Sequence, residues 1–187
     1  MFGIISTANA QLEQYHLDRP HTQILFSVSH LGLSRSHGKF LDYSASIVFN
    51  HDHIEKSSVN ATIQTNSLTL NDPAWDAHVK GKDMLDTQTY PTMTFKSLTI
   101  KPLTDKTADI AGELTLHGVT KPVTLHVTYN GANHDPFGND FRAGFLDTKN
   151  IKRTDFGISS GIPFVGDDIE IKIEVEAIRE DNEKRER

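Results

Sequence analysis

The chain has 187 residues, a formal net charge of -6 at pH 7 and a pI near 5.9. These numbers argue against a nucleic-acid partner, because neutralising phosphates needs a surplus of Lys and Arg gathered on one face. The sequence has no cysteine, which excludes disulfides, thiol nucleophiles and thiolate metal sites. No apolar stretch approaches the roughly 20 residues of a membrane-spanning helix. A single domain with a substantial core suits this length.

The N-terminal residues 1–10 form an apolar stub that ends in the small-residue triplet Ala8-Asn9-Ala10. This pattern resembles the end of a secretory signal peptide, and an ordinary N-terminus is an equally good interpretation. We expect a signal-peptide remnant over 1–10, one domain over 11–178 and a solvated charged tail over 179–187. The corresponding localisation is periplasmic or secreted.

Most of the chain predicts β-strands with one apolar and one polar face. The pattern is plainest from Ile169 to Val175, where apolar and charged residues alternate without a break. Only the segment from Pro73 to Lys80, and a possible turn around 150–155, indicate helix. Strands are predicted over 12–17, 22–30, 40–49, 57–65, 92–102, 108–117, 122–130, 140–148 and 168–178. This count predicts an all-β fold, an extended antiparallel barrel of about eight strands with one or two short helices.

The apolar faces of these strands leave two interpretations open. They can fill the interior as an ordinary core, which pattern alone favours. A barrel of about eight strands can also keep room for one small ligand. Periodicity does not decide between a solid and a hollow interior.

Five segments occur in the order and approximate spacing of the YceI family, and the chain resembles that family from about Tyr15 to Ile178. They are Phe26 to Gly32, Gly38 to Phe40, Tyr90 to Ser97, Gly112 to Val123, and Arg153 to Gly157. The resemblance implies a lipocalin-like barrel whose apolar pore binds a long isoprenoid chain, usually in the bacterial periplasm.

By this resemblance the apolar lining is a ligand-binding pore. The implied ligand-binding residues are Ile24, Phe26, Val28, His30, Phe40, Phe49, Met84, Met93, Phe95, Leu114, Leu116, Val123, Leu125, Phe141, Phe145, Ile171 and Ile173. The sequence departs from the family at Trp75, where a charged residue is usual, and at Met84-Leu85, where Phe-Phe is usual. These departures bear on ligand size and shape more than on the fold.

Several polar residues are candidates for chemistry. The cluster His51-Asp52-His53 could chelate a metal, but it follows a strand end and is more typical of a solvated turn, so no metal site is predicted. His30, His117 and the pair Asp76 and His78 match family motifs. They could bind a ligand head group or satisfy buried backbone groups.

Arg153 and Asp155 lie two residues apart, which on a strand places them on one face. We expect an ion pair between them that fixes the closing loop of the barrel, with Phe156 turned inward.

The sequence predicts a binding protein without catalytic residues or a cofactor. By the family resemblance we expect it to bind a polyprenyl lipid or an isoprenoid quinone for transport or storage. Such a ligand suits an apolar lining, because each buried CH₂ contributes roughly 0.8 kcal/mol without a polar partner. Transient membrane contact and a dimer are compatible with this function. One alternative is an enzyme that acts on a small amphiphile at the barrel mouth with His30, His117 or Asp76 and His78 as acid or base. A structural module with a solid core is another.

Overall fold

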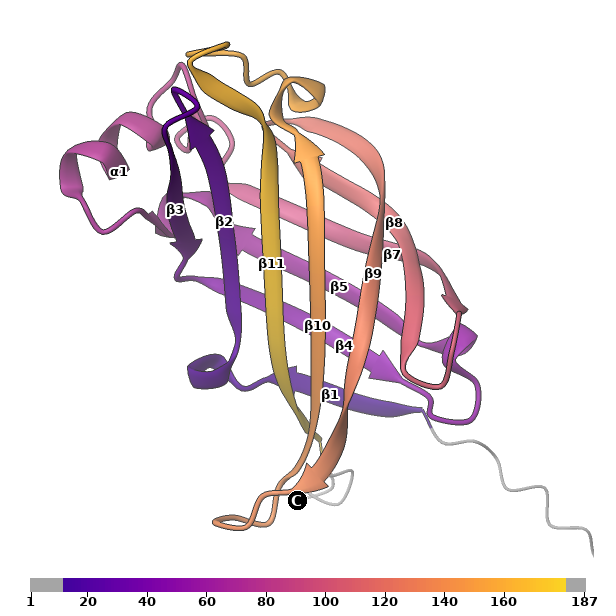
Figure 1. Ribbon diagram of the computed structural model, residues 1–187. Helices are drawn as coiled ribbons and strands as arrows, with labels where there is room; N and C mark the ends of the chain where they lie inside the picture. The colour runs from indigo at the N-terminus through magenta and orange to yellow at the C-terminus, as the bar shows by residue number, and fades with distance from the viewer. Residues whose placement is uncertain (1–11, 181–187) are drawn as a thin grey trace, which may run out of the picture.

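The computed structural model describes residues 12–180 and contains one antiparallel sheet of 11 strands (Figure 1). The predicted signal remnant over 1–10 and most of the predicted tail lie outside the described residues. The strands are β1 (Glu13–Leu17), β2 (Gln23–His30), β3 (Ser34–Phe40), β4 (Tyr43–Phe49), β5 (Ser58–Gln64), β6 (Leu68–Thr69), β7 (Thr92–Pro102), β8 (Thr107–Leu116), β9 (Val119–His134), β10 (Phe141–Lys152) and β11 (Val165–Arg179).

Eight of these strands close into a barrel, in the order β1-β4-β5-β7-β8-β9-β10-β11 and back to β1. The closing contact pairs Tyr15 of β1 with Arg179 of β11. Arg179, which the sequence assigns to the tail, therefore ends a barrel strand, and its Nη1 donates to Glu13 at 2.8 Å. The all-β barrel of about eight strands is confirmed.

The remaining strands extend the wall beyond the ring. β2 pairs with β11 next to β1, and β3 and β6 follow it in the sheet. The sequence did not predict β3, because its residues Ser34 to Lys39 are polar or small and show no apolar alternation. The short helix η1 (Arg19–His21) joins β1 to β2.

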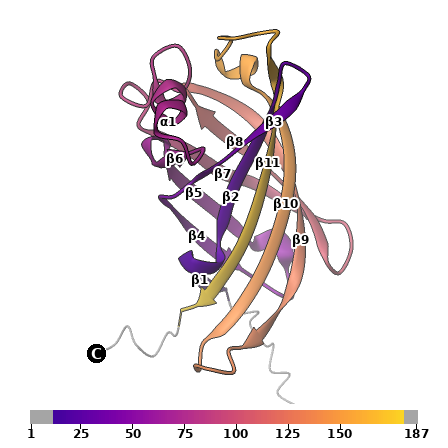
Figure 2. The same ribbon diagram turned by 60° about the vertical axis from the view of Figure 1, so that its left-hand side comes forward.

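The helix α1 (Pro73–Lys80) matches the predicted segment. The Asp72 carboxylate caps it by accepting hydrogen bonds from the backbone N–H groups of Ala74 and Trp75. Figures 1 and 2 show α1 at the end of the barrel where β2 turns into β3, while the β9–β10 connection projects from the opposite end. No helix within residues 12–180 is long and apolar enough to cross a membrane.

The predicted helical turn near 150–155 forms as the 3-10 helix η4 (Arg153–Phe156), and this changes the role of Arg153. The predicted ion pair with Asp155 is wrong, because the two residues are not on a strand. The buried Arg153 guanidinium instead donates to three backbone carbonyls, those of Ile158, Val165 and Gly166. Phe156 turns inward as expected and is 2% exposed.

The barrel interior is packed solid at the α1 end. Side chains from several strand ends and from the segment after β10 meet there: Phe40, Leu68, Leu116, Phe156 and Ile158 are all buried. We call this group the plug. A second, smaller cluster around Tyr15, Phe49 and Ala177 packs near the other end.

Candidate functional site: an apolar cavity in the barrel

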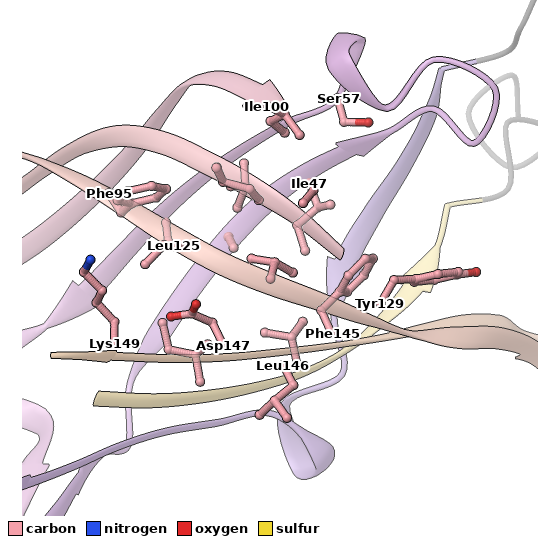
Figure 3. A pocket seen from close by; sticks show the side chains of 18 of the residues that line it. Ile47, Ser57, Phe95, Ile100, Leu125, Tyr129, Phe145, Leu146, Asp147 and Lys149 are labelled. Atoms are coloured by element: carbon pink, nitrogen blue, oxygen red, sulfur yellow. The ribbon is translucent and has the colours of Figure 1, made fainter. Parts of the chain in front are cut away.

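Beyond the plug, the barrel encloses an apolar cavity of about 230 Å³ (Figure 3). Its walls are inward side chains of β4, β5 and β7 to β11, together with Leu17 of β1 and Ile24 of β2. A cavity of about 150 Å³ with similar walls is enough to bind benzene. The barrel therefore has room for an apolar ligand.

The cavity lining divides the inward residues into two groups. Ile171 and Ile173 occupy inward positions on β11 and line the cavity. At the plug end, buried inward residues such as Phe40 and Leu116 are not part of the lining. Both interpretations of the apolar faces are thus realised, each in a different part of one barrel.

The cavity is long compared with its volume. On β9, the alternate residues Val123, Leu125, Val127 and Tyr129 all line it. Six residue steps at about 3.3 Å each give a lined length of about 20 Å. Such a shape suits a slender chain rather than a bulky ring system.

The end of the cavity away from the plug is more polar. It is bordered by Ser57, by Ser58 and by the β7–β8 turn from Thr104 to Thr107. Just inside, the rings of Phe49, Tyr129 and Phe145 pack together with centroids 5.6 to 5.7 Å apart. A ligand entering at this end would pass polar turns and then meet aromatic walls.

Two ionisable side chains interrupt the apolar lining on β10. Asp147 and Lys149 continue the inward series that begins at Phe145 and ends at Ile151, and Figure 3 shows Asp147 between Phe145 and Lys149. Asp147 is only 3% exposed. Burial raises the pKa of the Asp147 carboxyl, and a hydrogen bond from His126 and the charge of Lys149 partly oppose that effect.

Sequence reasoning missed these two residues. The period of two from Phe145 to Ile151 was the available signal. Asp147 lies inside the strand predicted over 140–148, but only apolar residues were assigned to the lining, and Lys149 lies beyond the predicted end. β10 in fact continues to Lys152, so the inward face extends past both ionisable residues.

Most of the residues that the family resemblance implies do line the cavity. They are Ile24, Phe49, Met93, Phe95, Leu114, Val123, Leu125, Phe145, Ile171 and Ile173. The others lie elsewhere. Phe40 and Leu116 belong to the plug, Phe26 packs against Phe40, and Phe141 lies under the Arg179 guanidinium. Val28, His30 and Met84 are also outside the cavity lining.

The candidate acid–base residues are likewise outside the cavity lining. The His117 ring forms a hydrogen bond with a backbone carbonyl, because its Nδ1 lies 3.1 Å from the backbone oxygen of Phe156. The Asp76 carboxylate accepts from the Leu70 N–H at 2.6 Å. His30 and His78 both pack edge-on against Trp75, outside the barrel.

The His51-Asp52-His53 cluster forms a turn, as the sequence favours. The side-chain oxygen of Asn50 accepts from the backbone N–H groups of Asp52 and His53. The two imidazoles have different partners, because His51 approaches Glu13 and His53 approaches Glu55. The two rings therefore do not share a chelation site.

The chain folds into an eight-stranded antiparallel barrel with an apolar cavity and one filled end. It is therefore a hollow-barrel protein. The chain belongs to the YceI family, because residues 15–177 match the YceI-like domain. A UPF0312 protein of Pseudomonas syringae pv. tomato is 38% identical over 163 residues, covering 86% of this chain and 84% of its own. One from Pseudomonas putida KT2440 is 36% identical over 180 residues, covering 95% and 93%.

Solved structures share the fold. BcnA of Burkholderia cenocepacia superposes with a TM-score of 0.78 at 26% identity, over 86% of this chain and 98% of its own. The YceI protein of Campylobacter jejuni gives 0.73 at 31% identity, over 82% and 90%. A polyisoprenoid binding domain from Saccharophagus degradans gives 0.66 at 15% identity, over 89% and 98%, which bears on the fold alone.

Proposed function

We propose that this protein binds a long-chain isoprenoid lipid, either a polyprenyl lipid or an isoprenoid quinone, in the barrel cavity and carries or stores it. The observation that carries the proposal is the apolar lining about 20 Å long, with polar turns at one end. Burial of each CH₂ along it contributes roughly 0.8 kcal/mol. The ligand class follows the resemblance to the YceI family, and a domain of the same fold from Saccharophagus degradans is named as polyisoprenoid binding.

The proposed role includes no covalent chemistry. The four candidate acid–base residues lie outside the cavity lining, and each contacts another group of the fold instead. The alternative of an enzyme at the barrel mouth therefore has no observation in its favour.

A periplasmic or secreted location is part of the proposal, on the basis of the signal-like stub over 1–10. A lipid carrier there would exchange its cargo through transient contact with a membrane. Cell fractionation of the native host tests the location: recovery of the protein in the cytosol alone would refute it.

Ligand extraction and a blocked variant test the binding function. Protein purified from its own cells should release a prenyl lipid into organic solvent, identified by mass spectrometry. Leu125→Trp places a bulky ring in the cavity and should abolish displacement of a fluorescent apolar probe by prenyl lipids. Leu98→Trp, at a residue that is 61% exposed, is the matched control and should bind normally. An empty native protein that also binds no prenyl lipid would refute the proposal.

A further inference from the structure

One carboxylate oxygen on the cavity wall has no partner. Asp147 lines the cavity and is 3% exposed, and its Oδ1 accepts from the backbone N–H of His126 at 2.7 Å. Its Oδ2 is buried and makes no hydrogen bond within residues 12–180. Buried polar atoms are almost always hydrogen-bonded, so this oxygen needs an explanation.

The structural role of Asp147 uses only half of its carboxyl group. The β9–β10 ladder runs from Phe141 to Leu146, where Leu146 pairs with Thr128, and it stops one residue before Asp147. Beyond this point the Oδ1 atom of Asp147, in place of a backbone carbonyl of β10, accepts the hydrogen bond from the N–H of His126 on β9. An asparagine could do the same through its amide oxygen. The second carboxylate oxygen is therefore not required by the wall of the barrel.

The surrounding charges select the kind of donor that can reach this oxygen. In its ionised form Asp147 only accepts hydrogen bonds, so a quinone or ether oxygen gives it nothing, and a high pH favours that form because burial raises the pKa of Asp147. Lys149 lies on the same inward face, and its positive charge favours the ionised form of Asp147. A phosphate or an ammonium would add an unbalanced charge to an apolar cavity, which is costly. A neutral hydroxyl donates a hydrogen bond without that cost.

We propose that Asp147 binds the hydroxyl group of an isoprenoid alcohol, which makes polyprenyl alcohols the preferred ligands of this cavity. This inference rests on the proposed lipid-binding function and specifies its head group. The alcohol oxygen would lie within the barrel, next to β10, and the apolar chain would follow the lining of β9 and β11.

Competition with a fluorescent apolar probe at pH 8 tests this inference. The ligands are a 20-carbon prenyl alcohol, its methyl ether and its monophosphate. The wild-type protein should bind the alcohol about 10- to 100-fold more tightly than the ether, as expected for a hydrogen bond to a charged group. In Asp147→Asn the preference should fall to about threefold or less, because the amide N–H donates equally to alcohol and ether oxygens.

Asp109→Asn is the matched control. The Asp109 carboxylate contacts the ring of the same His126 but lies outside the cavity lining, so this variant should keep the full preference. Equal binding of alcohol and ether by the wild-type protein would overturn the inference and leave lipid binding intact. The inference would also be overturned if the wild-type protein bound the monophosphate more tightly than the alcohol, or if Asp147→Asn kept the full preference for alcohol over ether. If none of the three compounds displaced the probe, the proposed function itself would fail.

Thermal unfolding of the unliganded Asp147→Asn variant shows whether it folds. If it does not, the relative affinities of the wild-type protein for the alcohol, the ether and the monophosphate decide whether the hydroxyl site exists. An alcohol preference below about threefold in the wild-type protein would then be sufficient to reject the hydroxyl site.

Discussion

The Nη1 atom of Arg142 on β10 donates a hydrogen bond to a carboxylate oxygen of Asp18, which precedes η1 near the start of the chain. The same atom donates to Glu176 of β11 at 2.7 Å, and the His21 ring approaches Asp18 at 2.6 Å. This cluster ties the β1–β2 connection to two long barrel strands. Its charged groups make the stability of the fold depend on pH in two opposite ways.

We expect Asp18→Asn to reduce the free energy of unfolding by about 1–3 kcal/mol at pH 7. Burial alone would raise the pKa of Asp18, but the hydrogen bonds from His21 and Arg142 outweigh it and hold the pKa below its ordinary 3.8. The stabilisation is therefore complete above pH 3.8 and is lost as the pH falls through the lowered value. Urea unfolding at pH 7 and pH 3 measures the difference.

The control for Asp18 is Asp168→Asn, since Asp168 has an exposed side chain and pairs with Lys152 on the surface. That variant should change stability by less than about 1 kcal/mol. If the Asp18 variant were as stable as the control at pH 7, the cluster would contribute nothing to the fold.

His21 should act in the opposite direction. Its hydrogen bond with Asp18, then the charges of Asp18 and Glu176, raise the pKa of the imidazole above 6.5. The stabilisation is complete below pH 6.5 and is lost as the pH rises through the raised value. NMR titration of the His21 ring should show the raised pKa, and Asp18→Asn should bring it down. An unshifted His21 in the wild-type protein would contradict the geometry.

We expect Gly112→Ala to destabilise the barrel by about 1–3 kcal/mol, in the range of other overpacked cores. An added Cβ would lie 2.6 Å from Cζ of Phe95 and closer still to the backbone oxygen of Lys96. Relief of this clash requires moving the backbone of the β7–β8 ladder, where Gly112 pairs with Ser97 beside a register shift. Gly138→Ala, whose Cβ would approach no atom more closely than 3.6 Å, is the control for chemical denaturation and should change little.

Truncating inward side chains should distinguish the filled end of the barrel from the hollow one. Phe40→Ala removes a plug residue and should cost about 3–5 kcal/mol, because it leaves a new cavity. Ile171→Ala should cost less than about 2 kcal/mol. Ile171 already borders the cavity, so its truncation enlarges an existing space instead of creating a new one. Thermal or urea unfolding compares the two. Equal losses would show that the interior around Ile171 is packed as tightly as the plug.

The alternation of apolar and polar residues was enough to predict the strands of the barrel. The strand predicted over 92–102 has the bounds of β7, and α1 occupies the segment from Pro73 to Lys80 that the sequence indicates as helix. β3 was not predicted because Ser34 to Lys39 carry no apolar face, and pairing with β2 and β6 makes them a strand. The Arg153 prediction failed because it placed Arg153 and Asp155 on one face as in a strand, whereas both lie in the 3-10 helix η4.

The sequence by itself determined which side chains turn inward, because a period of two is a property of the strand alone. Only the tertiary structure decided that Phe40 and Leu116 fill the barrel while Ile171 and Ile173 line a cavity. That outcome depends on how far apart opposite walls lie at each level of the barrel. The distance is set by pairings between strands remote in sequence, such as Tyr15 with Arg179, and by the segment that places Phe156 inside. No local pattern contains this information.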